Sequence, residues 1–198
     1  MTAVSEQVGS WVGLFAARKP AEPWLQELRE TAFRKFAELG FPDRHNEEWR
    51  FTNVAPIART GFRLLPAIRT LKLPAPVGDA SEELRTHLAR HAAFDQNPFT
   101  ALNTAFFDEV TVVRVPRGAV VAQPIEITCE APAGDGDQPV AVHPRTLVLV
   151  GANAQCSIVE TYKGLRTSES EDFLTAYRRV GMGPFKEALY DRSARSDI

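Results

Sequence analysis

The stretch "NPFTALNTAFFDEVTVVRVPRG", residues 97–118, changes character halfway along. Up to Phe107 its bulky residues are unevenly spaced, as in a helix or an irregular chain. Residues 110–115 are mostly β-branched and run into a Pro-Arg-Gly turn, which is typical of a strand. The stretch therefore predicts that a mainly helical region ends near residue 108 and that a sheet begins there.

The chain repeats itself beyond this switch. "TVVRVPRGA" (111–119) aligns with "TLVLVGANA" (146–154), and each copy is followed by a second strand-like string, "PIEITCE" and "CSIVETY". A strand, a sharp turn and a strand at constant spacing predict a β-solenoid. A β-sandwich is the alternative that the same strings allow. Parallel coils in a structure would indicate the solenoid, and antiparallel hairpins would indicate the sandwich.

Two helices are predicted before the switch. Residues 4–18 form an amphipathic pattern with Trp11, Leu14 and Phe15 on one side. The second pattern, residues 21–42, has Pro23 in its first turn and Gly40 as a left-handed cap. Apolar residues at spacings of 3 and 4 form its stripe: Leu25, Leu28, Ala32, Phe36 and Leu39.

The segments that follow the second helix have weaker patterns. Residues 43–62 predict an irregular segment packed on the helices. Residues 65–78 contain three prolines, which favour extended chain and predict a linker or a crossing strand. The expected anchors of the irregular segment are Trp49, Phe51, Val54 and Ile57.

A third helix is predicted to begin at Asp79, with Glu82 completing a capping box, and to end near Phe94. Its apolar face would hold Leu84, Leu88 and Ala92. His87 and His91 stand four residues apart on this helix, as zinc ligands do. The pair lacks the glutamate of a hydrolase motif, and two ligands do not close a structural site, so we expect no metal there.

The two cysteines lie in phase with the aliphatic residues of their strands. Cys129 and Cys156 are therefore predicted to point into the core. A buried free cysteine acts far more often as a small hydrophobe than as a nucleophile or ligand. Both thiols are expected to be reduced.

Other candidate side chains lack a partner in the sequence. Asp135 and Asp137 lie in a Gly-rich turn without the ligand series of a calcium loop. Glu47 and Glu48 could act as general acids, but nothing near them in sequence pairs with them. His143 is the one candidate catalytic residue for a hexapeptide-type acyltransferase, and the hexad spacing of that class is absent. We therefore predict no catalytic, cofactor-binding or metal-binding residue and no enzyme activity.

The charge balance and the hydropathy of the chain exclude further classes of function. Lys and Arg number 23 and Asp and Glu 25, for a net charge of -2. Such a balance does not attract nucleic acid or an anionic membrane. The first residues lack the pattern of a secretory signal, and no apolar run approaches the roughly 18 residues of a membrane span. The chain is expected to be soluble and cytoplasmic.

Three strings together resemble one protein family. "RHNEEWRFT" (44–52) is similar to a Glu-Asp-Trp-Arg-Tyr-Thr segment near the start of SufB and SufD proteins. Residues 97–125 resemble the segment with which SufD proteins begin their core domain, and residues 143–164 resemble the next rung of that core. The resemblance covers most of residues 20–164 and is to the SufB/SufD family, in its SufD-like form.

The resemblance implies an α+β fold with three parts. Residues 1–108 would be the N-terminal helical domain and 109–164 the first rungs of a parallel β-helix, the SufBD core. Residues 165–198 would be a divergent tail, partly helical or disordered, with a short helix at Phe173, Leu174 and Tyr177. The implied function is that of a scaffold component that assembles iron–sulfur clusters with SufB and the SufC ATPase. The alternative is a solenoid or sandwich binding module without catalytic activity.

The chain also departs from the family. The surface that binds the ATPase, the late rungs that pair with SufB and the cluster residues have no counterpart here. After Gly164 the chain reads like a truncation or a change of reading frame. The resemblance therefore implies an incomplete chain that binds no cofactor itself, the cluster belonging to the full complex. It carries over no site residue and leaves open whether Cys129 or Cys156 contacts iron.

Overall fold

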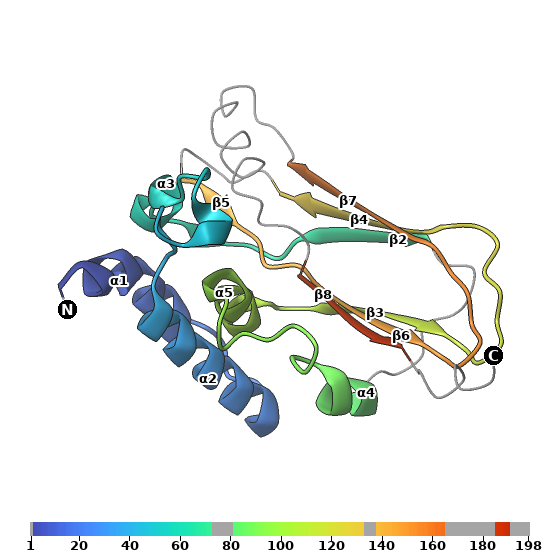
Figure 1. The fold of residues 1–198 in the computed structure, drawn as a ribbon. Helices are drawn as coiled ribbons and strands as arrows, with labels where there is room; N and C mark the ends of the chain where they lie inside the picture. Colours follow the sequence, from blue (N-terminus) through green and yellow to red (C-terminus); the bar gives the residue numbers. More distant parts are fainter. Residues whose placement is uncertain (1, 73–80, 133–137, 165–184, 191–198) are drawn as a thin grey trace.

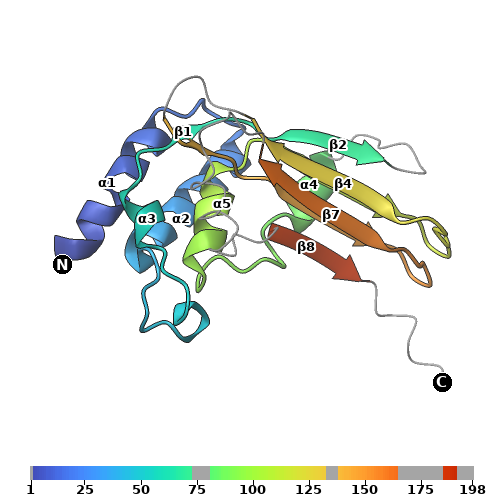
Figure 2. The same ribbon diagram turned by 90° about the horizontal axis from the view of Figure 1, so that it is seen from above.

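The computed structural model describes residues 2–72, 81–132, 138–164 and 185–190. It is a mixed α and β structure, which confirms the predicted α+β class. Helices α1, α2, α3 and α5 gather at one end of the molecule, and the two three-stranded sheets of the described residues extend away from them, with α4 lying apart from the other helices (Figure 1). Figure 2, seen from above, shows the same division, with α1, α2, α3 and α5 beside one another at the helical end.

The first two helices form as predicted. Helix α1 is Thr2–Ala16 and helix α2 is Pro23–Leu39. Gly40 ends α2 with a φ of 67°, and its N–H donates to the Phe36 carbonyl over 2.8 Å. The positive φ is one that glycine adopts without steric cost.

One residue of the predicted stripe of α2 is misplaced. Leu39 is 40% exposed rather than buried. The chain turns at Gly40, so Phe41 folds back instead and brings its ring centroid to 5.1 Å from that of Phe36. The buried side of α2 is formed by Arg29, Ala32 and Phe36.

The irregular segment after α2 contains two short helices, η1 (Glu47–Trp49) and α3 (Ala55–Arg59). Val54 and Ile57 are buried as predicted. Phe51 was expected to be an anchor, and this expectation is wrong, because Phe51 is 92% exposed. The 3₁₀ turn directs Trp49 inward onto Phe99. Phe51 is covered only by the Arg50 guanidinium, 5.4 Å from its ring centroid.

Helix α4, Ser81–His87, ends earlier than predicted. Ala89 has a left-handed φ of 61°, which helix cannot continue through. Leu88 is nevertheless buried, and Leu84 and Ala92 are half-buried. Asp79, the predicted first residue of the capping box, lies outside the described residues.

Helix α5, Pro98–Phe106, occupies the centre of the helical part. The Asn97 side chain caps it by accepting hydrogen bonds from the backbone N–H groups of Phe99 and Thr100. Every residue from Phe99 to Phe106 is buried. A helix that is buried all round has no polar face, which is why its sequence showed no helical period.

The strands form two three-stranded sheets and one short pair. One sheet has the order β3-β6-β8, the other β2-β4-β7, and β1 pairs with β5. All pairs are parallel except β2 with β4. The bounds are Arg63–Leu64 for β1, Ile68–Lys72 for β2, Val110–Val115 for β3, Ile125–Ala131 for β4, Val140–Ala141 for β5, Arg145–Val150 for β6, Ile158–Gly164 for β7 and Phe185–Tyr190 for β8.

The register confirms that the sequence repeat is a structural repeat. Thr111 lies beside Thr146, and the pairing continues in step to Val115 beside Val150. The turns that follow are also equivalent, because Gly118 has a φ of 71° and Asn153 a φ of 58° at matched positions. Strands β3 and β4 thus lie beside their copies in the next repeat, β6 and β7, and not beside each other in a hairpin.

A second apolar core lies between the two sheets. It is separate from the core of the helical part, which is centred on Trp11, Phe36 and Phe106 and includes Ala141 of β5. The side chains of the core between the sheets are Val113, Val115, Ile125, Ile127, Cys129 and Val148. The segment 65–78, predicted as a linker or a crossing strand, supplies β2 on the free side of β4.

The tail differs from its prediction. No strand was expected after Gly164, yet β8 pairs with β6 in parallel over six residues, with Ala188 beside Val148. Residues 185–190 read FKEALY, in which apolar and polar residues do not alternate, so the sequence carries no period-2 signal for this strand. The helix predicted at Phe173, Leu174 and Tyr177 lies outside the described residues.

The pairing of β8 with β6 leads to a first test. A chain that ends at Gly164 lacks β8, so one side of β6 loses its backbone partners and becomes an edge on which other chains can pair. We expect this chain to sediment as dimers or larger species at concentrations where a chain ending at Tyr190 remains monomeric. Equal sedimentation of the two chains would show that β8 does not protect β6.

Candidate functional site at the junction of helices and sheets

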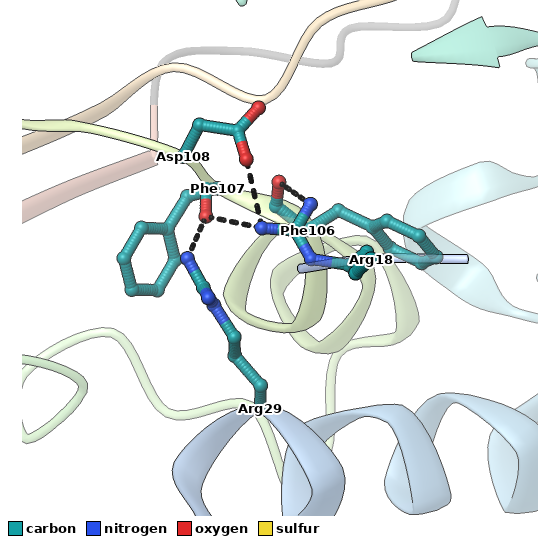
Figure 3. A network of polar contacts seen from close by, with 5 residues as sticks. All are labelled: Arg18, Arg29, Phe106, Phe107 and Asp108. Carbon is teal, nitrogen blue, oxygen red and sulfur yellow. Dashed lines mark hydrogen bonds and ion pairs between the residues drawn. The ribbon is translucent and has the colours of Figure 1, made fainter. Parts of the chain in front are cut away.

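Two arginines fasten α1 and α2 to the end of α5 (Figure 3). Arg18, just beyond α1, donates from Nη1 to the Phe106 carbonyl over 2.8 Å and from Nη2 to the Asp108 carboxylate over 2.8 Å. Arg29 of α2 donates from Nη2 to the Phe107 carbonyl over 2.7 Å, and Arg18 shares that carbonyl at 3.2 Å. The last turn of α5, where the chain passes toward β3, is therefore held by two cations.

The electrostatics of this cluster suit a helix C-terminus. The last carbonyl groups of a helix have no partner within it and carry partial negative charge, so cations there are favourable. Burial, and then the nearby Arg18, lowers the pKa of Arg29 to about 10, so the guanidinium remains protonated at neutral pH. Each cation also lies over an aromatic ring, Arg18 over Phe106 and Arg29 over Phe107. These contacts fix the positions of α1 and α2 relative to the end of α5.

A second set of hydrogen bonds joins α5 to the start of β6. The Asn103 side chain donates from Nδ2 to the Pro144 carbonyl over 3.0 Å. The Arg145 guanidinium, which is 1% exposed, donates to Asn103 Oδ1 and Thr104 Oγ1 over 3.2 and 3.4 Å. The turn between β5 and β6 is thereby fixed to the helical part.

His143 lies in that turn and is enclosed by aromatic rings. Its ring centroid is 5.3 Å from that of Phe106, nearly parallel to it, and 5.9 Å from that of Trp11, edge to face. Burial, and then the charge of Arg18, lowers the pKa of His143 to about 3. Beside the ring is a hollow of about 10 Å³ lined by residues that include Asp108 and Glu109. That volume suits one water molecule.

The predicted histidine pair does not form a metal site. His87 is the last residue of α4, and the left-handed Ala89 turns the chain before His91. The two imidazoles are therefore not on one helical face. Among the described residues, no group of three or more His, Cys, Asp and Glu side chains could hold a metal ion.

The cysteines follow the predicted pattern of burial. Cys129 is buried between the sheets, and Cys156 is half-buried against the same core. Burial raises the pKa of the Cys156 thiol, which disfavours the thiolate that iron or a disulfide exchange would need. Asp135 and Asp137 lie outside the described residues. Glu47 is exposed at the start of η1, and Glu48 lies in the middle of the same short helix.

Sequence reasoning missed the three arginines that hold the junction. By residue type alone, Arg18, Arg29 and Arg145 look like ordinary surface cations. A signal exists for Arg29, which stands three residues before Ala32 and seven before Phe36, on the buried face of α2. No equivalent pattern marks Arg18 or Arg145, whose partners lie far away in the sequence.

Comparison with known proteins relates part of the chain to a described family. Residues 16–77 match the family described as the SufBD protein N-terminal region, which supports a relation between this part of the chain and the SufB and SufD proteins. The match spans α2, η1, α3, β1 and β2, whereas α5 and nearly all of α1 lie outside it. No curated protein and no solved structure matches the chain. Within the part that the structure describes, no helix is long and apolar enough to cross a membrane.

Proposed function

We propose that this chain is a SufD-type component of an iron–sulfur cluster assembly scaffold. The observation that carries the proposal is the match of residues 16–77 to the SufBD N-terminal region. The resemblance of residues 97–125 and 143–164 to the first core segments of SufD supports the finer assignment to SufD. It also supports the view that the chain corresponds to the first part of a longer scaffold protein.

We further propose that the two sheets are the first coils of a parallel β-helix. Three observations support this: strands pair with their own repeats, the pairs are parallel, and the left-handed turn residues Gly118 and Asn153 fall at matched positions. A sandwich built of consecutive hairpins would instead pair β3 with β4. The alternative that remains is a solenoid binding module unrelated to clusters, and the family match favours the scaffold.

In this proposal the chain has no catalytic group of its own and binds no cluster alone. Its partners are a SufB-like protein and a SufC-like ATPase in the cytoplasm. The role of the described residues is architectural: the helical end is docked by Arg18 and Arg29, and the coils that follow present β-structure for further assembly. Neither nucleic acid nor a membrane is a partner in this proposal.

A chimera tests the proposal. Residues 1–164 of this chain replace the corresponding N-terminal part of a known SufD protein in cells that lack SufD, grown under iron limitation. We expect the chimera to co-purify with SufB and SufC and to restore the activity of an iron–sulfur enzyme. The experiment tests whether residues 1–164 can replace the N-terminal part of SufD within a complete protein. It does not require the isolated chain to bind a partner.

The matched control is a SufD protein from which the same N-terminal part is deleted. A chimera that is folded by circular dichroism and yet no better than this deletion in co-purification would contradict the proposal. A chimera that co-purifies without restoring enzyme activity would contradict it as well, since the role would then extend no further than binding.

A further inference from the structure

His143 stands where the helical end and the sheets meet. It lies between Val142 and Pro144, all buried, in the turn from β5 to β6. Its ring packs on Trp11 of α1 and on Phe106 of α5. The imidazole thus belongs to the sheet region but packs within the aromatic cluster of the helical region. Any change in its charge acts directly on the contact between the two.

The surroundings of His143 accept only a neutral ring. Nε2 is fully buried and has no hydrogen-bond partner among the described residues. An imidazolium has a proton on both nitrogens, and an unpaired buried charge is strongly unfavourable. In the neutral tautomer with the proton on Nδ1, Nε2 carries no proton and is an uncharged acceptor, which costs far less to bury than a charged group.

The charged groups around His143 come from each neighbouring element. Arg18, beyond α1, places its guanidinium over the same Phe106 ring on which His143 stacks, so a second cation would be repelled. Arg145 follows two residues later at the start of β6, and Arg63 is on β1 beside β5. Helix α5 itself has no ionisable residue.

Two carboxylates oppose these cations. Asp108 and Glu109 line the hollow beside the imidazole. Both are exposed, and Asp108 is already paired with Arg18 at 2.8 Å. Solvent therefore screens their attraction for an imidazolium, and the balance favours the neutral ring.

We propose that His143 is an acid-sensitive latch that holds the helical end against the strands only while its imidazole is neutral. When His143 takes up a proton, the turn at residues 142–145 leaves the aromatic cluster, the ring becomes hydrated, and α1 loses its packing against the sheet region. The core between the two sheets, which contains no histidine, stays closed. The inference concerns conformation and does not depend on the proposed role in cluster assembly.

Hydrogen exchange of the full chain at pH 7.5 and pH 5.0, corrected for intrinsic rates, tests the latch. A histidine with an ordinary pKa of about 6.5 when released and a strongly lowered one when packed makes the opened state about 30-fold more populated at pH 5.0 than at pH 7.5. We expect amide protection in α1 and in residues 141–145 to fall by that factor. Protection in β4 should stay the same.

Two substitutions remove the titrating group. His143→Phe retains an aromatic ring and His143→Gln retains a polar side chain, and either should abolish the difference between the two pH values. The matched control is His45→Gln, which removes an imidazole that is 95% exposed and should retain the full difference. If His143→Phe does not fold, His143→Gln and the unsubstituted chain still decide the matter.

Nitrogen-15 chemical shifts of the imidazoles provide a second readout that a purely structural role would not change. The signals that vanish in His143→Gln belong to His143, and at pH 5.0 the folded, protected molecules should show its neutral form. Protection of α1 that is independent of pH would overturn the proposal. So would the same pH difference in the variants, or a protonated His143 in a chain that remains closed.

Discussion

Replacing Trp11 by alanine is expected to lower the free energy of unfolding by about 3–5 kcal/mol, the usual cost of removing a large buried aromatic side chain. Trp11 is 2% exposed. Its ring centroid lies within 6.4 Å of four phenylalanine rings, and it also contacts the ring of His143. Its loss would open a cavity at the point where α1, α2, α5 and the turn before β6 meet. In a thermal melt the midpoint should fall by roughly 6–20 °C.

Two variants make this result specific. Trp11→Phe should cost less than the alanine variant, because it retains most of the packing and removes an indole N–H that is buried without a partner among the described residues. Trp49→Ala should also cost less, about 1–2 kcal/mol, since Trp49 is half-buried and packs mainly on Phe99. Equal losses for Trp11→Ala and Trp49→Ala would show that the aromatic cluster is not centred on Trp11.

The sequence correctly predicted those helices and strands in which apolar residues recur at the spacing of a single buried face. Helix α2 carries its own start at Pro23, a stripe at helical spacing and a stop at Gly40, and it forms over those residues. The repeat of residues 111–119 at 146–154 predicted which strands lie side by side, because neighbouring copies of a structural repeat place equivalent residues next to each other. In both cases the information lies within a short window or in a comparison of two such windows.

Other features depend on contacts that no short window contains. Phe51 looks like a core residue by type, and only the direction of the turn at η1 makes it 92% exposed. Arg29 looks like a surface residue, and only the nearby end of α5, 78 positions away in sequence, makes it a buried cap. The predicted pairing of His87 and His91 is wrong for the same reason. It assumed a helix that continues past Ala89, whereas the left-handed conformation of Ala89 ends the helix before His91.

The junction shows why the candidate site in particular was not predictable. Its groups come from just beyond α1, from the middle of α2, from the end of α5 and from the start of β6, and several of their hydrogen bonds are accepted by backbone carbonyls. A carbonyl acceptor leaves no trace in the residue type that bears it. The sequence therefore reveals at most the donor side chain of each such hydrogen bond. In an ion pair, by contrast, both partners can be recognised from their residue types.

The repeat also predicts where an added methyl group is least tolerated. Gly151 follows β6, directly beside the Pro-Arg-Gly turn of the preceding repeat, and its N–H donates to the Val115 carbonyl over 2.8 Å. A Cβ on Gly151 would lie 2.6 Å from the backbone nitrogen of Arg117 and 2.9 Å from its Cα. Both are backbone atoms, so relief requires the two turns to move apart. We expect Gly151→Ala to cost about 2–3 kcal/mol, the range of overpacked cores.

The matched variant is at Gly118, the residue that takes the left-handed conformation in the first turn. A Cβ there meets nothing within 4 Å, and asparagine occupies the equivalent position, Asn153, with a φ of 58°. Asparagine tolerates this conformation better than other residues with a side chain, so Gly118→Asn should cost less than about 1 kcal/mol. Denaturant unfolding of both variants compares the cost of the close approach of the two turns with the cost of the left-handed backbone conformation. If Gly151→Ala were as stable as the unsubstituted chain, the two turns could not be stacked as closely as the parallel register of β3 and β6 requires.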